Sequence, residues 1–126
     1  RQGLFSKAAH QYRLLFSHHA NYSYLQSLAE ALVKAKAFDE ALVDCIKLIK
    51  VSPQDDELYL LRAKCYLGKH DLPRAIKDLD QCIQRSKKSN KEAYKLRASA
   101  LRLMGNRQLA TDDETRLKEM EQESIR

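Results

Sequence analysis

The sequence contains no tryptophan, three glycines and two prolines, so it has little of the material from which tight turns are made. Strand-rich folds need many turns, and this scarcity therefore favours long helices joined by short connections. No apolar run reaches the ~18 residues that a membrane-spanning helix needs, and we expect no membrane partner. A length of 126 residues, with 44% hydrophobic and 32% charged residues, is typical of one folded domain.

Cysteine is scarce as well. Cys45, Cys65 and Cys82 are odd in number and have no C-x-x-C spacing, which argues against a disulfide framework and against a zinc site. We expect them to be small core residues in a reducing compartment, the cytoplasm or the nucleus. The chain begins with Arg1 and is expected to be part of a longer protein, so the ER lumen stays open.

The residue patterns that catalysis needs are missing from the sequence. It has no glycine-rich phosphate loop, no nucleophile elbow and no paired carboxylates on an inner helix face. The histidines do not share metal-ligand spacing with a Cys, Asp or Glu on one helix face: His10, His18, His19 and His70. We therefore predict a protein that is not an enzyme and that has no cofactor and no metal.

What the sequence does have is an alanine that returns at a nearly fixed interval. Ala8, Ala41, Ala75 and Ala110 are separated by 33, 34 and 35 residues. A period of this length indicates a solenoid of helix pairs. Upstream of three of these alanines two more columns recur, a large residue (Leu25, Tyr59, Tyr94) and, four residues later, a small one (Ala29, Ala63, Ala98). Small residues on both helices of a pair let the two backbones approach closely.

These columns resemble the tetratricopeptide repeat, over essentially the whole chain. The resemblance implies an all-α, right-handed superhelical solenoid of antiparallel helix pairs with about seven helices. It also implies a single array over residues 1–126, made of the second helix of a truncated repeat (4–17), two full repeats (22–51 and 56–86) and a C-terminal repeat (91–124). The Arg62-Ala63 and Arg97-Ala98 pairs resemble repeats of eukaryotic co-chaperones. Ser89 and Glu92 have the spacing of a capping box at the start of the last repeat.

The two ends of the predicted array differ. The first helix carries an apolar stripe that includes Phe5, Tyr12 and Phe16, and we expect further repeats upstream or self-association to cover it. The last helix has Arg107 and Glu114 in columns that are apolar elsewhere. A polar outer helix is what the end of an array needs, so we expect the array to end there.

The resemblance implies that the first helices of the pairs line a concave groove that holds a ligand. Leu60, Leu61, Leu96 and Leu103 predict an apolar strip in this groove. The residues expected to contact a protein partner are Leu60, Leu61, Lys64, Lys95, Leu96 and Arg102, with leucines as anchors and basic groups for carboxylates of a peptide or helix. A co-chaperone or an adaptor in a multiprotein complex is the concrete form of this function.

A second set of positions argues against one specific ligand. The family's carboxylate clamp, which holds acidic C-terminal tails, needs Lys, Asn and Arg at five places. Here those places hold Gln26, Glu30, Leu61, Glu92 and Leu96, and two acidic groups would repel a carboxylate. We expect no clamp in this segment.

Two other functions stay open. A basic stripe formed by Arg85, Lys87, Lys88 and Lys91 could serve a nucleic-acid-associated protein. A purely structural scaffold that only stacks or self-associates is the third alternative. Arg62 and Arg97 are expected to lay their stems on the core with their charged heads in water.

Overall fold

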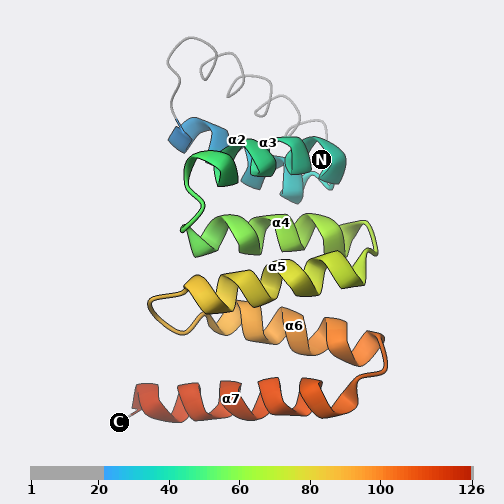
Figure 1. Ribbon diagram of the computed structural model, residues 1–126, viewed down its shortest axis with the longest axis vertical. Coiled ribbons are helices and arrows are strands. Elements are labelled where there is room, and N and C mark those ends of the chain that lie inside the picture. Colours follow the sequence, from blue (N-terminus) through green and yellow to red (C-terminus); the bar gives the residue numbers. More distant parts are fainter. Residues whose placement is uncertain (1–21, 126) are drawn as a thin grey trace.

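The computed structural model describes residues 22–125 and forms a stack of helices within that range (Figure 1). The helices are α2 (Tyr22–Lys34), α3 (Phe38–Val51), α4 (Asp56–Gly68), α5 (Leu72–Arg85), α6 (Lys91–Leu103) and α7 (Arg107–Ile125). Consecutive helices run in opposite directions and pack as the pairs α2–α3, α4–α5 and α6–α7. The all-α solenoid of antiparallel pairs is thereby confirmed. None of these helices is both long enough and apolar enough to span a bilayer.

Several predictions fall outside the described residues. They are the helix over 4–17, its apolar face with Phe5, Tyr12 and Phe16, and the histidines at 10, 18 and 19.

Side chains placed just before the helices fix where several of them begin. The Asp71 carboxylate accepts a hydrogen bond from the backbone N–H of Arg74 at 3.4 Å at the start of α5. Asn90 accepts from the backbone N–H of Ala93 at 3.1 Å and is the N-cap of α6. The N-cap therefore lies one residue after Ser89, and the predicted capping box is wrong, because the third residue after Asn90 is Ala93 and not a glutamate. Asparagine caps a helix as well as serine does, and here it is Asn90 that has the extended backbone of an N-cap.

The turn inside each pair has the same backbone geometry. Its central residue is left-handed, with φ of 61° at Lys36, 61° at His70 and 86° at Gly105. The residue that follows donates its N–H to a carbonyl five positions earlier: Ala37 to Leu32 at 2.8 Å, Asp71 to Tyr66 at 2.9 Å, and Asn106 to Leu101 at 2.8 Å. This Schellman arrangement satisfies the last carbonyls of the first helix and returns the chain along it.

Because a left-handed backbone strains residues that have a Cβ, glycine is expected to stabilise the two turns that lack it. His70→Gly should raise the free energy of unfolding by about 0.5–1 kcal/mol after the greater freedom of glycine in the unfolded chain is subtracted. The matched change in the third turn, Gly105→Ala, should lower it by about 1 kcal/mol. Urea denaturation of the two variants measures both effects. A loss of stability in His70→Gly would contradict the turn geometry.

Three hydrophobic clusters hold the stack together. The first joins α2, α3 and α4 around Leu25, Leu28 and Cys45, and the second joins α4, α5 and α6 around Tyr59, Leu60 and Leu79. The third and smallest lies between α6 and α7. The recurring alanines lie at the helix crossings, where Ala29, Ala41, Ala63, Ala75 and Ala110 are all 0% exposed. Small buried side chains at these positions let the helices pack closely.

All three cysteines lie in these cores as free thiols with 0% exposure. Desolvation by burial raises the pKa of Cys82 to about 12. A hydrogen bond with Cys65, followed by burial, raises the pKa of Cys45. The same hydrogen bond lowers the pKa of Cys65. Because thiolates react far faster than thiols, the raised pKa values slow the reaction of Cys45 and Cys82, whereas Cys65 is protected by its burial alone.

We therefore expect the native protein to show no rapid reaction of Cys45, Cys65 or Cys82 with a thiol reagent such as Ellman's reagent at neutral pH. Full reaction should follow on addition of guanidinium chloride, because unfolding exposes the thiols and returns their pKa values to the ordinary range. Absorbance of the released thiolate measures the number of reacted cysteines. Rapid native reaction of any of the three would contradict its burial.

Candidate partner-binding groove

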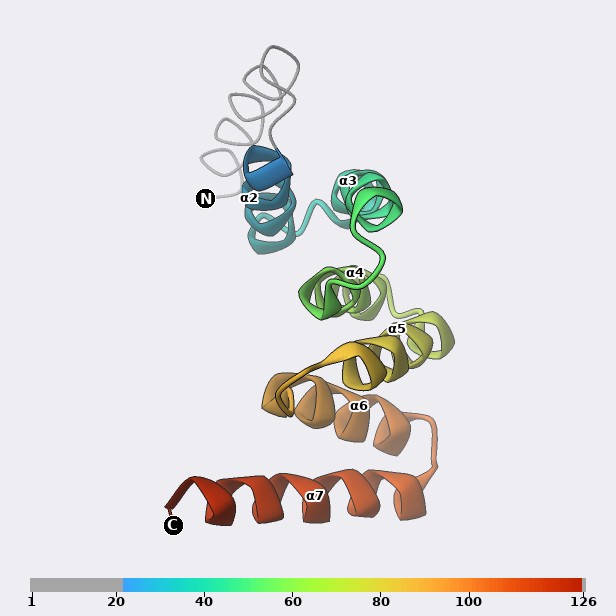
Figure 2. The same ribbon diagram turned by 60° about the vertical axis from the view of Figure 1, so that its left-hand side comes forward.

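Helices α2, α4 and α6 follow one another down the same side of the stack (Figure 2). Between α2 and α4 this side is hollowed by a depression of ≈ 210 Å³. We call it the first depression. Its lining residues are Gln26, Glu30, Val33, Lys34, Glu57, Leu60, Leu61 and Lys64.

The two leucines predicted as exposed anchors form the floor of this depression and are buried. Leu60 is 3% exposed and Leu61 is 8% exposed. Leu61 belongs to the core shared with α2 and α3, and Leu60 belongs to the core shared with α5 and α6. The expected apolar strip is therefore corrected: α4 is packed between the preceding pair and the following helix, and this packing takes up its apolar side chains. Leu96 is half-buried against the same core as Leu60, whereas Leu103 is 75% exposed.

A second depression of ≈ 280 Å³ lies between α6 and α7. Its lining residues are Tyr94, Lys95, Ala98, Ser99, Arg102, Asp113, Glu114 and Leu117. The six predicted contact residues thus divide between two sites. Leu60, Leu61 and Lys64 line the first depression, Lys95 and Arg102 line the second, and Leu96 lines neither.

Two of the three basic groups predicted for the groove are already paired. The Lys64 amino group lies 3.3 Å from Glu92, and Arg102 pairs with Glu114 across the α6–α7 gap. Lys95 is exposed and forms no ion pair with any residue between 22 and 125. An approaching carboxylate would therefore compete with Glu92 at Lys64 and with Glu114 at Arg102, but it would meet no such competitor at Lys95.

Acidic groups gather at the other end of the first depression. The pKa of Glu57 is raised by burial and then by the charges of Asp56, Asp55 and Glu92. Its carboxylate accepts a hydrogen bond from the Asn90 side-chain amide at 3.3 Å. The first depression therefore carries both signs of charge, acidic near the start of α4 and basic toward Lys34 and Lys64, rather than the basic rim that was expected.

Two of the four residues in the predicted basic stripe already contact other residues of the protein. The Arg85 guanidinium donates to the backbone carbonyl of Pro53 at 2.9 Å and lies over the Tyr59 ring at 4.8 Å. Lys91 donates to the Ser124 hydroxyl at 3.2 Å. Only the loop lysines of this set, 87 and 88, are exposed without a partner in the part of the chain that the structure describes.

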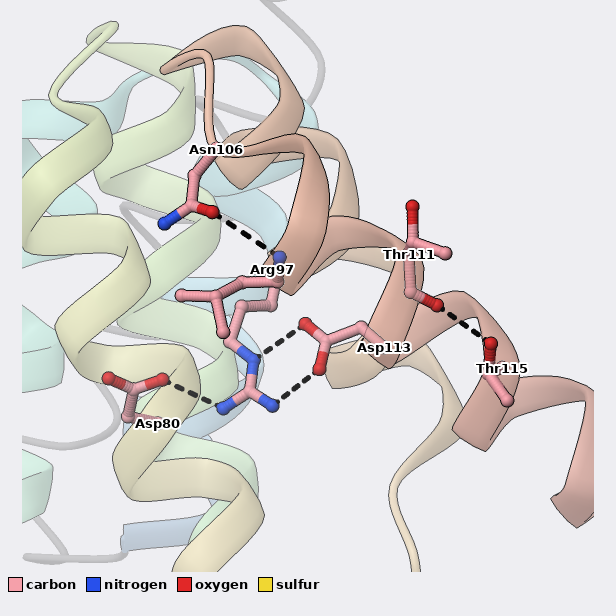
Figure 3. Close-up of polar contacts among 7 residues, drawn as sticks. Asp80, Arg97, Asn106, Thr111, Asp113 and Thr115 are labelled. Atoms are coloured by element: carbon pink, nitrogen blue, oxygen red, sulfur yellow. Dashed lines mark hydrogen bonds and ion pairs between the residues drawn. The ribbon is translucent and has the colours of Figure 1, made fainter.

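The charged heads of Arg62 and Arg97 do not lie in water, and this prediction was wrong. Arg62 donates two hydrogen bonds to Asp78, at 2.8 and 2.7 Å. Arg97 donates two to Asp113, at 2.8 and 2.6 Å, and a third to Asp80 at 2.8 Å. Figure 3 shows the Arg97 guanidinium between Asp80 of α5 and Asp113 of α7. Because Asp78 and Asp113 are 3% and 5% exposed, leaving them without a cation would be costly, and the arginines neutralise them.

Several residues that line the depressions were missed in the sequence. Val33 lines the first, and Glu114 and Leu117 of α7 line the second, although only first helices were expected there. The signal for α7 was present in the sequence, because Glu114 is polar at a position that is apolar in the other pairs. Within residues 22–125, no group of three or more His, Cys, Asp or Glu side chains could hold a metal ion.

No family model matches the chain, and no curated protein matches it. Solved structures do match. MamA from Desulfovibrio magneticus RS-1, residue 41 to its end, superposes with a TM-score of 0.88 at 16% identity, over 96% of this chain and 68% of that one. The MamA RS-1 double mutant gives 0.89 at 15%, over 97% and 68%. A further crystal structure of MamA gives 0.83 at 17%, over 91% and 67%.

MamA is a tetratricopeptide-like protein, and the match extends along the helix pairs described above. This chain has the tetratricopeptide fold. At sequence identities of 15–17% the structural similarity establishes the fold of the array. It does not establish the ligand, which we infer from the surface residues of this chain.

Proposed function

We propose that this tetratricopeptide array is a protein–protein interaction module that holds an extended or helical segment of a partner on its α2–α4–α6 side. The observation that carries the proposal is the first depression, in which an apolar floor of Leu60, Leu61 and Val33 is bordered by charges of both signs. A co-chaperone that holds a substrate, or an adaptor of a larger complex, would use such a surface.

The predicted contact residues keep distinct roles in this proposal. Leu60 and Leu61 supply the apolar floor without inserting into the partner. Lys64 and Lys95 offer charge to partner carboxylates, Lys95 more readily because it has no ion pair among the described residues. Leu96 packs against the core that contains Leu60, and Arg102 acts together with Glu114 in the second depression. Charge of both signs favours a partner segment of mixed charge over an acidic tail.

The test is selection of binding peptides from a random display library, followed by affinity measurements on the selected peptides. The variant Lys34→Glu/Lys64→Glu reverses charge at the first depression without touching its buried floor. It should weaken the selected peptides by about tenfold, equivalent to about 1.4 kcal/mol. Leu61→Asp is unsuitable, since a charge at a buried position would unfold the pair.

The matched control is Lys47→Glu/Lys50→Glu, which makes the same charge change at exposed positions of α3. If the affinity fell equally in both double variants, the effect would follow from net charge alone. That result would contradict binding at the groove. Peptides that bind the control variant normally and the groove variant weakly would support it.

A further inference from the structure

Two further hollows lie away from the first depression. One of them, of ≈ 340 Å³, lies between α4 and α5 and is lined by Tyr59, Arg62, Tyr66, Arg74, Lys77 and Asp78, among others. We call it the cationic cleft. On α4, Tyr59, Arg62 and Tyr66 follow a helical spacing of three and four residues, which places them on the face opposite Glu57, Leu61 and Lys64. The cationic cleft is therefore separate from the groove and does not depend on the proposed function.

The last pair carries an equivalent hollow with different chemistry. This acidic cleft, of ≈ 280 Å³, has Leu101, Leu109 and Asp112 in its lining. Those residues stand at the repeat positions that Tyr66, Arg74 and Lys77 occupy in the cationic cleft. The ion pair at the centre is the same in both, Arg62 with Asp78 in one and Arg97 with Asp113 in the other. The ion pair is thus a structural feature that both clefts share. The clefts differ in the residues around it, which we call the rim.

Two cations on the rim of the cationic cleft, Arg74 and Lys77, are accessible to a ligand. Arg62 is neutralised by Asp78, in two hydrogen bonds of 2.8 and 2.7 Å. The Arg74 guanidinium forms an ion pair with the Asp71 carboxylate at 2.8 Å. Its side chain is nevertheless 71% exposed and can still reach a ligand. Lys77 is exposed and has no ion pair within residues 22–125, and the Tyr66 hydroxyl adds a hydrogen-bond donor. Charged donors that converge on a hollow favour anionic ligands.

We propose that the cationic cleft binds acidic peptide segments, with Arg74 and Lys77 pairing to Asp or Glu side chains of the bound chain. The Tyr66 hydroxyl donates a further hydrogen bond. Arg62 remains paired with Asp78 and forms the floor of the cleft. This is a binding site additional to the groove, on the other face of α4.

The Tyr59 ring argues for an acidic peptide and against a nucleic acid. Single-stranded nucleic acids gain much of their affinity from bases stacked on open aromatic faces. Tyr59 is 6% exposed, and its ring is approached by the Arg85 guanidinium at 4.8 Å and by Arg62 at 5.8 Å. Its hydroxyl is held by the Pro53 carbonyl at 2.9 Å. The ring is therefore not open to a base, and the carboxylates of a peptide fit the remaining donors better.

The experiment is fluorescence anisotropy with a short labelled polyglutamate peptide, and with a polyglutamine peptide of equal length as the neutral control. The key variant is Arg74→Leu/Lys77→Asp, which installs the residues that the acidic cleft has at the same positions. It should bind polyglutamate about tenfold more weakly than wild type, which corresponds to about 1.4 kcal/mol. Both substitutions are at exposed positions, and unchanged circular dichroism shows that the variant is folded.

A matched variant, Lys87→Leu/Lys88→Asp, makes the same change of charge on the α5–α6 loop and should bind polyglutamate within about twofold of wild type. Equal weakening by the two variants would overturn the site, because the effect would then follow net charge alone. Absence of polyglutamate binding by wild type at low salt would also overturn it.

A labelled oligothymidylate is titrated in parallel to test the class of ligand. Tighter binding of oligothymidylate than of polyglutamate, lost in Arg74→Leu/Lys77→Asp, would overturn the assignment to acidic peptides. Binding of polyglutamate that is lost in this variant alone, with weaker binding of oligothymidylate, would support it.

Discussion

Replacing Arg97 with leucine is expected to lower the free energy of unfolding by about 3–5 kcal/mol, because the change leaves a buried carboxylate without its cation. The Asp113 side chain is 7% exposed and accepts two hydrogen bonds from Arg97, at 2.8 and 2.6 Å. Without the guanidinium, Asp113 must stay charged in the α6–α7 contact or take up a proton. Urea denaturation followed by far-UV circular dichroism measures the loss.

Two further variants separate the ion pair from other effects of the substitution. Arg97→Leu/Asp113→Leu should recover most of the lost stability, since two apolar groups of similar volume can replace a buried pair. Arg74→Ala removes a pair whose arginine is 71% exposed and screened by water, so this variant should change stability far less than Arg97→Leu does. A loss in Arg97→Leu no larger than that in Arg74→Ala would show that Asp113 does not depend on Arg97.

The second large effect is expected at Leu79, which is 0% exposed in the core shared by α4, α5 and α6. Leu79→Ala should lower the free energy of unfolding by about 2–5 kcal/mol, through lost apolar burial and the cavity that remains. The same urea titration measures it, and thermal unfolding gives an independent estimate.

The repeat supplies the control for Leu79, because Glu114 stands at the same position of the last pair. Its side chain is 48% exposed and pairs with Arg102. Glu114→Ala should therefore change stability by less than about 1 kcal/mol. If both alanine variants lost the same free energy, the alignment of α5 with α7 would be wrong.

The fold could be predicted because its determinants are local and recur. The alanines at 41, 75 and 110 mark close helix crossings, and the short turns between helices follow from the same period. A predictable long-range contact was nevertheless missed. Arg62 is bonded to Asp78 and Arg97 to Asp113, and each acid lies 16 residues after its arginine. An arginine and an acid that recur together at a fixed spacing in two repeats indicate a pair across the helices.

The groove was less predictable, because helical periodicity indicates which residues share a face but does not say what covers that face. Leu60 and Leu61 lie on the side of α4 that borders the first depression, yet neighbouring helices contact both of them. Similarly, the charge of Lys64 is visible in the sequence, whereas its pairing with Glu92 depends on how α4 and α6 are aligned. Burial and pairing are properties of the assembled stack.

Arg97 also has a mechanical consequence for the array. Its guanidinium fastens α5, α6 and α7 to one another, whereas Arg62 joins only α4 to α5. In the first pair, Ile46 stands where Asp80 stands in the second, so no equivalent bridge from α3 to α4 can form at that position. Under shear between neighbouring helices, α5 and α6 should resist sliding through this bridge, whereas α3 and α4 are held by the first hydrophobic cluster.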